Sequence, residues 1–275
     1  MFFSDIEKVI PERNIICVSP HYDDFLFFLG SYVIEMKRKG VLDSKRFTNI
    51  STVSRTNYQE GDSIGNKDRS LARVKYATGI RFVEDLECLD DLLGLHNYVY
   101  RVMGEEESMT RGLVLNEKEG EMEMTFGSYE VMVQCDWDIL ERMEKCISEL
   151  AMLENTAIVL PLSMKGHIDH FVVREAGVRA MVKPGGKAAF YFAEDKPYAG
   201  IMTHEEHSIN DEFIAKYALT DRAFRGHPEE ILRLANLHYS SQVNPVYDEG
   251  ILNRAEQLKE IYKTDIECDR IFKYN

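Results

Sequence analysis

The chain has 275 residues, of which 44% are hydrophobic, and its formal net charge at pH 7 is -14. The hydrophobic share is sufficient for a buried core and excludes a chain that is disordered throughout. The negative charge repels phosphate backbones and anionic lipid surfaces, so neither nucleic acid nor a membrane is an expected partner.

We expect neither a signal peptide nor a disulfide framework. Asp5 and Glu7 interrupt the apolar core that a signal peptide would need, and no later run reaches the ~20 apolar residues of a membrane span. The five cysteines are odd in number, widely spaced and never arranged as CxxC, which argues against a disulfide framework and a thiolate zinc site. We therefore expect a cytoplasmic protein with a single domain over residues 1–275.

The first elements form a strand, a loop and a helix. A buried strand is predicted over 14–18, where β-branched and apolar residues run together before Pro20. After Asp24, apolar residues recur at helical spacing, and a basic run before Gly40 is typical of a helix end.

The alternation of strands and helices continues after this unit. We predict a strand over 47–53, a helix over about 67–78 that ends at Gly79, and a third strand over 81–89. Such alternation is typical of a parallel sheet. The expected fold class is therefore α/β, a three-layer Rossmann-like, mostly parallel sheet flanked by helices.

A glutamate-rich stretch then interrupts the alternation. It predicts a surface insertion over about 104–130 that ends in a hairpin through Tyr129, and its charges are interpreted as a solvated face. The elements expected after it are a helix over 137–152, a strand over 156–160, a helix over about 167–181, a strand over 188–193 and a mostly helical part over about 204–275.

Two short segments, Pro20–Asp24 and Gly166–His170, carry the residues suited to chemistry. Each follows a predicted buried strand, and ligands of open α/β sheets bind at the carboxyl ends of strands. In each segment two candidate ligands stand three residues apart, a spacing that places them on one face of a helical turn. We therefore expect the two segments to converge on one pocket.

The residue types in these segments indicate a catalytic metal. Imidazoles with one carboxylate suit zinc, and three protein ligands leave positions open for water and a carbonyl oxygen. We assign His21, Asp24 and His170 as ligands to one divalent ion. Asp23 is then free to take a proton from bound water, and His167 is placed to stabilise or protonate the departing group.

Two further roles follow from the same segments. Asp169 is expected to orient one of the imidazoles. For Asp23, a helix N-cap is the alternative interpretation, and the two roles do not exclude each other. Taken together, the two segments predict a metal-dependent amide hydrolase.

These motifs resemble the signatures of the LmbE/PIG-L type zinc N-deacetylases (N-acetylglucosaminyl deacetylase-like), PHxDD after the first strand and a later GHxDH. The likeness extends to residues 71–91 and to the aromatic segment Phe190–Tyr198, and it covers about the first 200 residues. It implies the same three zinc ligands, with Asp23 as general base and His167 as general acid. The reaction it implies is removal of an N-acetyl group from an acetamido sugar or sugar conjugate by metal-activated water.

Three residues depart from the family's pattern. Phe25 stands where the family usually has Glu, and Leu29 replaces the first glycine of a pair. Lys165 occupies a position where a tyrosine often supports the oxyanion. It can face the oxyanion as a cation or be a solvated loop residue.

Substrate-contacting residues are less clearly matched. The family's Arg and Glu in the helix before the third strand have no clean counterpart, so Arg69 and Arg73 are the nearest candidates, and Tyr198 is expected to line the cleft. The expected partner is a small N-acetylated sugar or glycoside, with homo-oligomerisation left open. The alternatives are a catalytically silent metal- or carbohydrate-binding relative and an amidase with a non-sugar substrate. Retention of Asp23 and His167 favours an enzyme.

Overall fold

A seven-stranded sheet forms the centre of the computed structural model, which describes residues 2–111, 117–118, 121–122 and 127–275. The strand order is β3-β2-β1-β6-β7-β9-β8; the first five strands are parallel, β9 is antiparallel to β7, and β8 is antiparallel to β9. The expected α/β class with a mostly parallel sheet is confirmed. The strands are β1 (Asn14–Ser19), β2 (Arg46–Ser51), β3 (Tyr98–Val102), β6 (Thr156–Pro161), β7 (Ala189–Ala193), β8 (Thr220–Arg225) and β9 (Cys268–Lys273).

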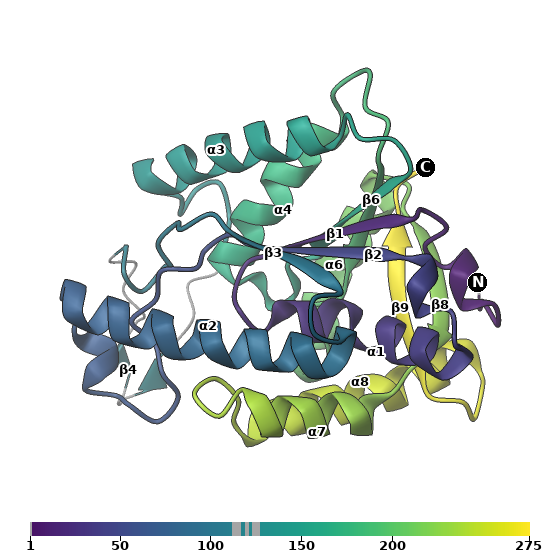
Figure 1. The fold of residues 1–275 in the computed structure, drawn as a ribbon. Helices are drawn as coiled ribbons and strands as arrows, with labels where there is room; N and C mark the ends of the chain where they lie inside the picture. Colours follow the sequence, from purple (N-terminus) through teal and green to yellow (C-terminus); the bar gives the residue numbers. More distant parts are fainter. Residues whose placement is uncertain (1, 112–116, 119–120, 123–126) are drawn as a thin grey trace.

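Helices cover both faces of this sheet (Figure 1). Side chains of β1 alternate between the faces: Ile15 belongs to the core cluster on one face, and Ile16 belongs to the cluster on the other. The first cluster is covered by α1 (Asp24–Lys39), α2 (Leu71–Leu93), α7 (Pro228–His238) and α8 (Pro245–Tyr262), and the second by α3 (Gln134–Leu150), α4 (Ile168–Met181) and α6 (His204–Lys216).

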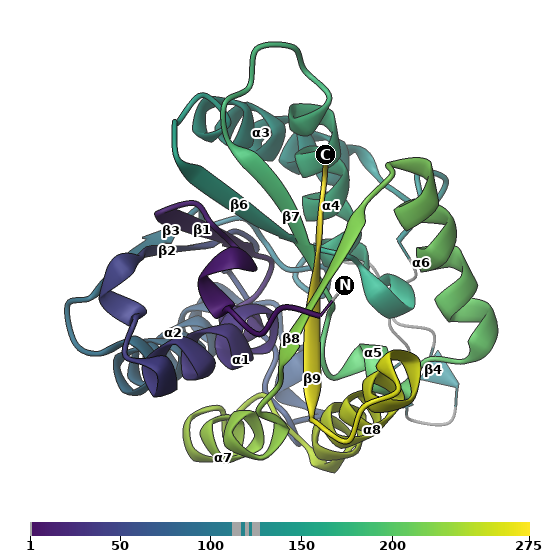
Figure 2. The ribbon, with the colours of Figure 1, turned by 90° about the vertical axis from the view of Figure 1, so that its right-hand side faces the viewer.

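Shorter elements connect these layers. The short helix α5 (Tyr198–Ile201) packs against α8, and the two lie beside the lower part of β9 in Figure 2. Single 3₁₀ turns stand at Ile6–Lys8, Leu42–Ser44, Gly65–Lys67 and Met164–Gly166. None of the helices in the described ranges combines the length and apolar character needed to cross a bilayer.

Helix α1 matches its prediction and explains two departures from the family pattern. It ends at Gly40, whose φ of 68° is left-handed and whose N–H bonds back to the last turn. Phe25 and Leu29 are fully buried in the core cluster on the α1 face, and the Phe25 ring meets Phe47 edge to face. The two side chains therefore serve the packing of α1 against the sheet.

The strand predicted over 81–89 is wrong, and so is the helix end at Gly79. One helix, α2, runs from Leu71 through Gly79 to Leu93. Ile80, Phe82 and Val83 suggest a strand by composition, yet the buried positions recur at helical spacing, because the helix turns one stripe toward α1 and α7. The third strand of the sheet is β3, which follows the helix.

The insertion differs from its prediction in two respects. Its hairpin is formed by β4 (Glu117–Lys118) and β5 (Glu121–Met122), while Tyr129 lies beyond it, stacked on Trp137. The rest of residues 112–126 lies outside the described residues. Glu107, in the same stretch, is buried rather than solvated, so the interpretation of its charge is also wrong.

The prediction of a mostly helical part over about 204–275 is incomplete. It contains α6, α7 and α8, but also β8 and β9, which extend the sheet beyond β7 (Figure 2). Both strands carry charged residues among the apolar ones, as in Asp221 and Asp269, so neither shows the continuous apolar run that marks the central strands. For this reason the sequence did not predict the two antiparallel strands at this edge of the sheet.

Candidate active site

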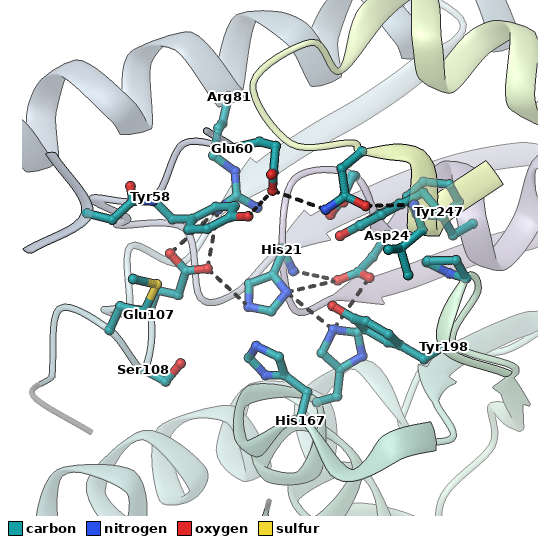
Figure 3. Close-up of a pocket in the computed structure, with 18 of the residues that line it drawn as sticks. His21, Asp24, Tyr58, Glu60, Arg81, Glu107, Ser108, His167, Tyr198 and Tyr247 are labelled. Carbon is teal, nitrogen blue, oxygen red and sulfur yellow. Dashed lines mark hydrogen bonds and ion pairs between the residues drawn. The ribbon is translucent and has the colours of Figure 1, made fainter. Parts of the chain in front are cut away.

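A cavity of about 700 Å³ opens at the carboxyl ends of the parallel strands. His21 follows β1, His167 and His170 follow β6, and Asp195 follows β7, and these three strands are neighbours in the sheet. The remaining wall comes from the loop after β2, from α2 and from the start of α8 (Figure 3). The lining residues used below are His21, Asp23, Asp24, Tyr58, Glu60, Asp62, Arg81, Glu107, Ser108, His167, His170, Lys196, Tyr198, Asn244 and Tyr247.

Two imidazoles and one carboxylate converge at one end of the cavity. The potential ligand atoms of His21, Asp24 and His170 all lie within 4.8 Å of one another, and all three residues are buried. His21 Nδ1 lies 3.2 Å from His170 Nε2, and Asp24 places one oxygen 3.7 Å from the first nitrogen and the other 3.6 Å from the second. The structure thus brings together the three residues predicted to be ligands.

Each imidazole is held by a carboxylate on its other nitrogen. His21 Nε2 lies 3.1 Å from Asp169 Oδ2, and His170 Nδ1 hydrogen-bonds to Asp195 Oδ1. A carboxylate behind a histidine fixes the tautomer and the ring orientation of a metal ligand. With these nitrogens bonded to carboxylates, His21 Nδ1 and His170 Nε2 face each other beside Asp24.

The electrostatics of this group favour a cation. Burial alone would lower the pKa of His170, but Asp24 and Asp195 raise it to about 9. Burial also raises the pKa of Asp24. Positive charge is therefore stabilised between the rings, and a divalent ion bound by two imidazoles and a carboxylate fits this donor set.

A second group of possible ligands shares His21 with the first. It consists of His21, His167 and Asp169, with ligand atoms again within 4.8 Å. In this group His167 Nδ1 already accepts a hydrogen bond from the Asp169 backbone N–H at 3.1 Å. In the first group the facing nitrogens meet each other and Asp24 rather than a backbone N–H, so this group is the better metal site.

Asp23 lines the cavity next to the metal group without being part of it. It occupies the N-cap position of α1, yet its side chain makes no cap hydrogen bond, and within the described ranges its carboxylate has no hydrogen-bond partner. Asp23 therefore stands at the N-cap position, as the alternative interpretation expected, but it does not make the hydrogen bond of an N-cap residue. The carboxylate is free to act on a molecule in the cavity.

His167 caps α4 and turns its other nitrogen to the cavity. Because Nδ1 accepts the Asp169 N–H, the neutral ring carries its proton on Nε2. Burial holds the pKa of His167 well below its usual range, with neighbouring His21 and His170 acting in the same direction. The resting side chain is thus a neutral hydrogen-bond donor.

Asp169 lies behind the site in a buried ion-pair network. Its Oδ1 lies 2.7 Å from Arg111 Nη2, and the same guanidinium reaches Asp136 at 2.8 Å through Nε. Burial alone would raise the pKa of Asp169, but Arg111 and His21 hold it well below the usual range. The carboxylate therefore stays ionised and contacts His21, which is the placement that the predicted orienting role requires.

A second buried pair, Arg81 with Glu107, forms the floor beside His21. Arg81 Nη1 lies 3.2 Å from Glu107 Oε1, which in turn lies 3.7 Å from His21 Nε2. Arg81 Nε donates to Gln242 at 2.7 Å. In the described part of the chain Nη2 makes no hydrogen bond, so it remains available to a bound molecule.

The candidates Arg69, Arg73 and Lys165 are not brought into the cavity. Arg69 is exposed, and Lys165, in the turn Met164–Gly166, is not among the residues that line the cavity. Arg73 bonds to the loop over 57–66 instead, through Asn57 and Asp62. Arg69 and Arg73 were the wrong candidates because α2 is longer than predicted. The arginine of α2 that lines the cavity is Arg81, about two turns after Arg73.

Tyr198 does line the cavity, as predicted. Its ring meets His170 at 6.2 Å and Tyr247 at 6.4 Å between centroids. Tyr247 comes from the C-terminal part, for which the sequence suggested no role. Asp195 and Glu107 were also missed; Asp195 stands two residues after a predicted strand, so its position was an available signal, whereas nothing local marks Glu107.

The fold and the buried two-histidine, one-aspartate group define an α/β protein with a candidate metal centre at the carboxyl ends of its parallel strands. No protein-family model matches the chain, and no curated protein matches its sequence.

Solved structures of deacetylases share this fold. The chain is 16% identical to a teicoplanin deacetylase in a zinc-inhibited form, with a TM-score of 0.65 over 94% of this chain and 97% of that one. It is 15% identical to the A40926 pseudoaglycone deacetylase, with a TM-score of 0.59 over 96% and 97%. For the N,N'-diacetylchitobiose deacetylase of Pyrococcus horikoshii, the identity is 12% and the TM-score 0.54 over 97% and 86%. The chain therefore has the fold of these deacetylases.

Proposed function

We propose that this protein is a zinc-dependent hydrolase that removes an N-acetyl group from an acetamido sugar or sugar conjugate. The observation that carries the proposal is the buried group of His21, Asp24 and His170 at the end of a polar cavity, with the unbonded carboxylate of Asp23 beside it. The shared fold with deacetylases of teicoplanin and of N,N'-diacetylchitobiose supports it.

His21 and His170 would hold the ion through their facing nitrogens, and Asp24 through a carboxylate oxygen. When bound, zinc supplies a Lewis acid for the acetamide carbonyl and lowers the pKa of water. Asp169 and Asp195 keep both rings in the required tautomer. The ligand positions are thus fixed before any substrate arrives.

Asp23 acts as the general base in this proposal. Its carboxylate accepts a proton from the attacking water as the new C–O bond forms at the acetyl carbon, and it returns that proton to the nitrogen as the C–N bond breaks. The products are acetate and a free amine. Because no described residue hydrogen-bonds to the Asp23 side chain, the base is not diverted from this task.

His167 acts as a hydrogen-bond donor to the reacting group. With Nδ1 bonded to the backbone, Nε2–H can stabilise the oxyanion or the departing nitrogen. The depressed pKa supports this role over that of a resting imidazolium acid. The sequence suggested that His167 either stabilises or protonates the departing group. The hydrogen bond at Nδ1 favours the stabilising role.

The remaining wall suits a polar ring. Tyr58, Tyr198 and Tyr247 supply aromatic faces, and the free Nη2 of Arg81 supplies a donor for sugar oxygens. This combination of aromatic faces with a few fixed polar groups favours a sugar over a purely apolar amide.

Metal analysis and amide hydrolysis on one preparation test the proposal. We expect about one zinc per chain after reconstitution, and acetate release from a panel of N-acetyl sugars. His170→Ala should lose both zinc and turnover, while His204→Ala, at an exposed position on α6, should keep both.

Two outcomes would replace this function with an alternative. Zinc binding without hydrolysis of any amide would favour a silent metal- or carbohydrate-binding relative. Hydrolysis of N-acetyl amino acids but of no N-acetyl sugar would favour an amidase with a non-sugar substrate.

A further inference from the structure

Glu60 presents a carboxylate to the cavity that has only uncharged partners. It lies in the loop between β2 and α2, and its Oε2 accepts hydrogen bonds from the Tyr58 hydroxyl and from Asn244 Nδ2, the latter at 3.2 Å (Figure 3). No lysine, arginine or histidine nitrogen of the described residues lies within 4.0 Å of this carboxylate. Its Oε1 makes no hydrogen bond within the same ranges.

The other charges of the wall are compensated. Asp24 and Asp23 lie at the metal group, where a divalent cation would offset them. The remaining charged side chains each have a partner of opposite sign: Glu107 with Arg81 at 3.2 Å, Asp62 with Arg73 at 2.9 Å, and Lys196 with Asp269. Glu60 is thus the negative charge of the described wall that is left without a counter-charge.

The position of Glu60 is fixed from both sides. Its backbone N–H donates to Ser241 O at 2.7 Å, and Arg73 Nε donates to Asn57 O at 2.9 Å, which ties the loop to α2. Asn244, which contacts the carboxylate, is itself held as the N-cap of α8 by its 3.0 Å bond from Val246 N–H. A carboxylate held in this way does not need to be ordered when a ligand binds.

Glu60 and His167 line different sides of the cavity. Figure 3 places Glu60 on the opposite side of His21 from His167, in the same cavity as the metal group, so it is within the space open to the remainder of a substrate whose acetyl group lies at that group. The free Oε1 can accept a hydrogen bond from that remainder. A cation there would gain a charge-assisted bond, and an anion would be repelled.

Building on the proposed deacetylase function, we propose that Glu60 determines specificity by selecting substrates whose remainder carries a positive charge, such as a free amine, over substrates that carry a carboxylate or phosphate.

Three glycosides of N-acetylglucosamine that differ only in the end of a short aglycone test this proposal. The 2-aminoethyl, 2-hydroxyethyl and carboxymethyl glycosides are cationic, neutral and anionic, respectively. We expect kcat/KM for acetate release, and affinity by calorimetry, to fall in that order, with about tenfold between the cationic and the neutral compound. Equal values for the three compounds in the native enzyme would overturn the proposal.

Glu60→Gln supplies the matched variant, because the amide oxygen can still accept from Tyr58. We expect it to bring the cationic and neutral compounds within about twofold of each other, while the exposed Glu205→Gln leaves the order unchanged. A preserved order in Glu60→Gln would also contradict the assignment. Calorimetry separates the two proposals: charge-ordered binding without acetate release counts against the deacetylase function alone, and acetate release without charge order counts against Glu60 alone.

Discussion

Asp195 holds the ring of His170 from behind, and no motif in the sequence pointed to it. Its Oδ1 bonds to His170 Nδ1, and its Oδ2 accepts the Met164 backbone N–H at 2.8 Å. The side chain therefore links β7 to the segment after β6. Under the proposed function, a residue in this position would fix the orientation of a metal ligand without touching the metal.

Weakening this support should lower metal affinity. We expect Asp195→Asn to weaken zinc binding by about 10- to 100-fold, because the amide cannot fix the same tautomer with a charge-assisted bond. Competition with a chromophoric chelator measures the affinity. Asp211→Asn, at an exposed position on α6, should bind zinc as the native protein does. Unchanged affinity in Asp195→Asn would show that His170 is oriented by packing alone.

Asp23 offers a test that separates a base from a helix cap. Asparagine caps helices about as well as aspartate, so Asp23→Asn should leave the unfolding midpoint and the zinc content nearly unchanged. Turnover should fall by about 10²- to 10⁴-fold, because the amide cannot take a proton from water. Acetate release at saturating substrate provides the measurement. Native turnover in this variant would rule out the base.

At the scale of elements, α2 shows where composition misled the prediction. Gly79 and the β-branched residues after it suggested a helix end and a strand, whereas the helix continues with Gly79 exposed in its interior. A Cβ added at Gly79 meets no atom within 4 Å. An exposed glycine inside a helix carries an entropic cost that alanine lacks.

Gly79→Ala should therefore stabilise the protein by about 0.5–1 kcal/mol. The opposite result is expected for Gly200→Ala, since a Cβ on α5 would lie 1.8 Å from Gly250 O on α8. We expect that variant to lose about 1–3 kcal/mol. Chemical denaturation of both variants checks the pair. Destabilisation by Gly79→Ala would mean that α2 is interrupted there, as the sequence had suggested.

Much of the fold and part of the site could be predicted. The central strands β1, β6 and β7 are buried on both faces and show continuous apolar runs, and the motifs after β1 and β6 contain His21, Asp24 and His170. Glu107 and Arg81 could not be placed, because a buried ion pair depends on tertiary packing and leaves no periodic trace. Tyr247 reaches the cavity only through the fold of the C-terminal part.

At the scale of the whole molecule, acidic residues outnumber basic ones. The buried carboxyl group of Asp85 makes the stability of the fold depend on pH in its own way. Asp85 is a fully buried residue of α2 that accepts hydrogen bonds from Tyr100 of β3 and, at 2.6 Å, from Tyr239 at the end of α7. Burial raises its pKa to about 8, although the two hydroxyls act in the opposite direction. The folded protein therefore keeps a proton on Asp85 at neutral pH.

This proton links folding stability to pH with a definite sign. Between about pH 4 and pH 8 the folded state binds the Asp85 proton and the unfolded state does not, so stability falls as pH rises, by about 1.4 kcal/mol per pH unit at most. Asp85→Asn removes the titration. Between pH 5 and pH 7, the free energy of unfolding of the native protein should drop by about 2–3 kcal/mol relative to that of the variant. Urea unfolding at both pH values measures the difference, and Asp265→Asn, which removes an exposed charge, should follow the native protein. Parallel pH profiles for the native protein and Asp85→Asn would mean that Asp85 is ionised in the folded state, and that the pH dependence arises from the net charge of -14 alone.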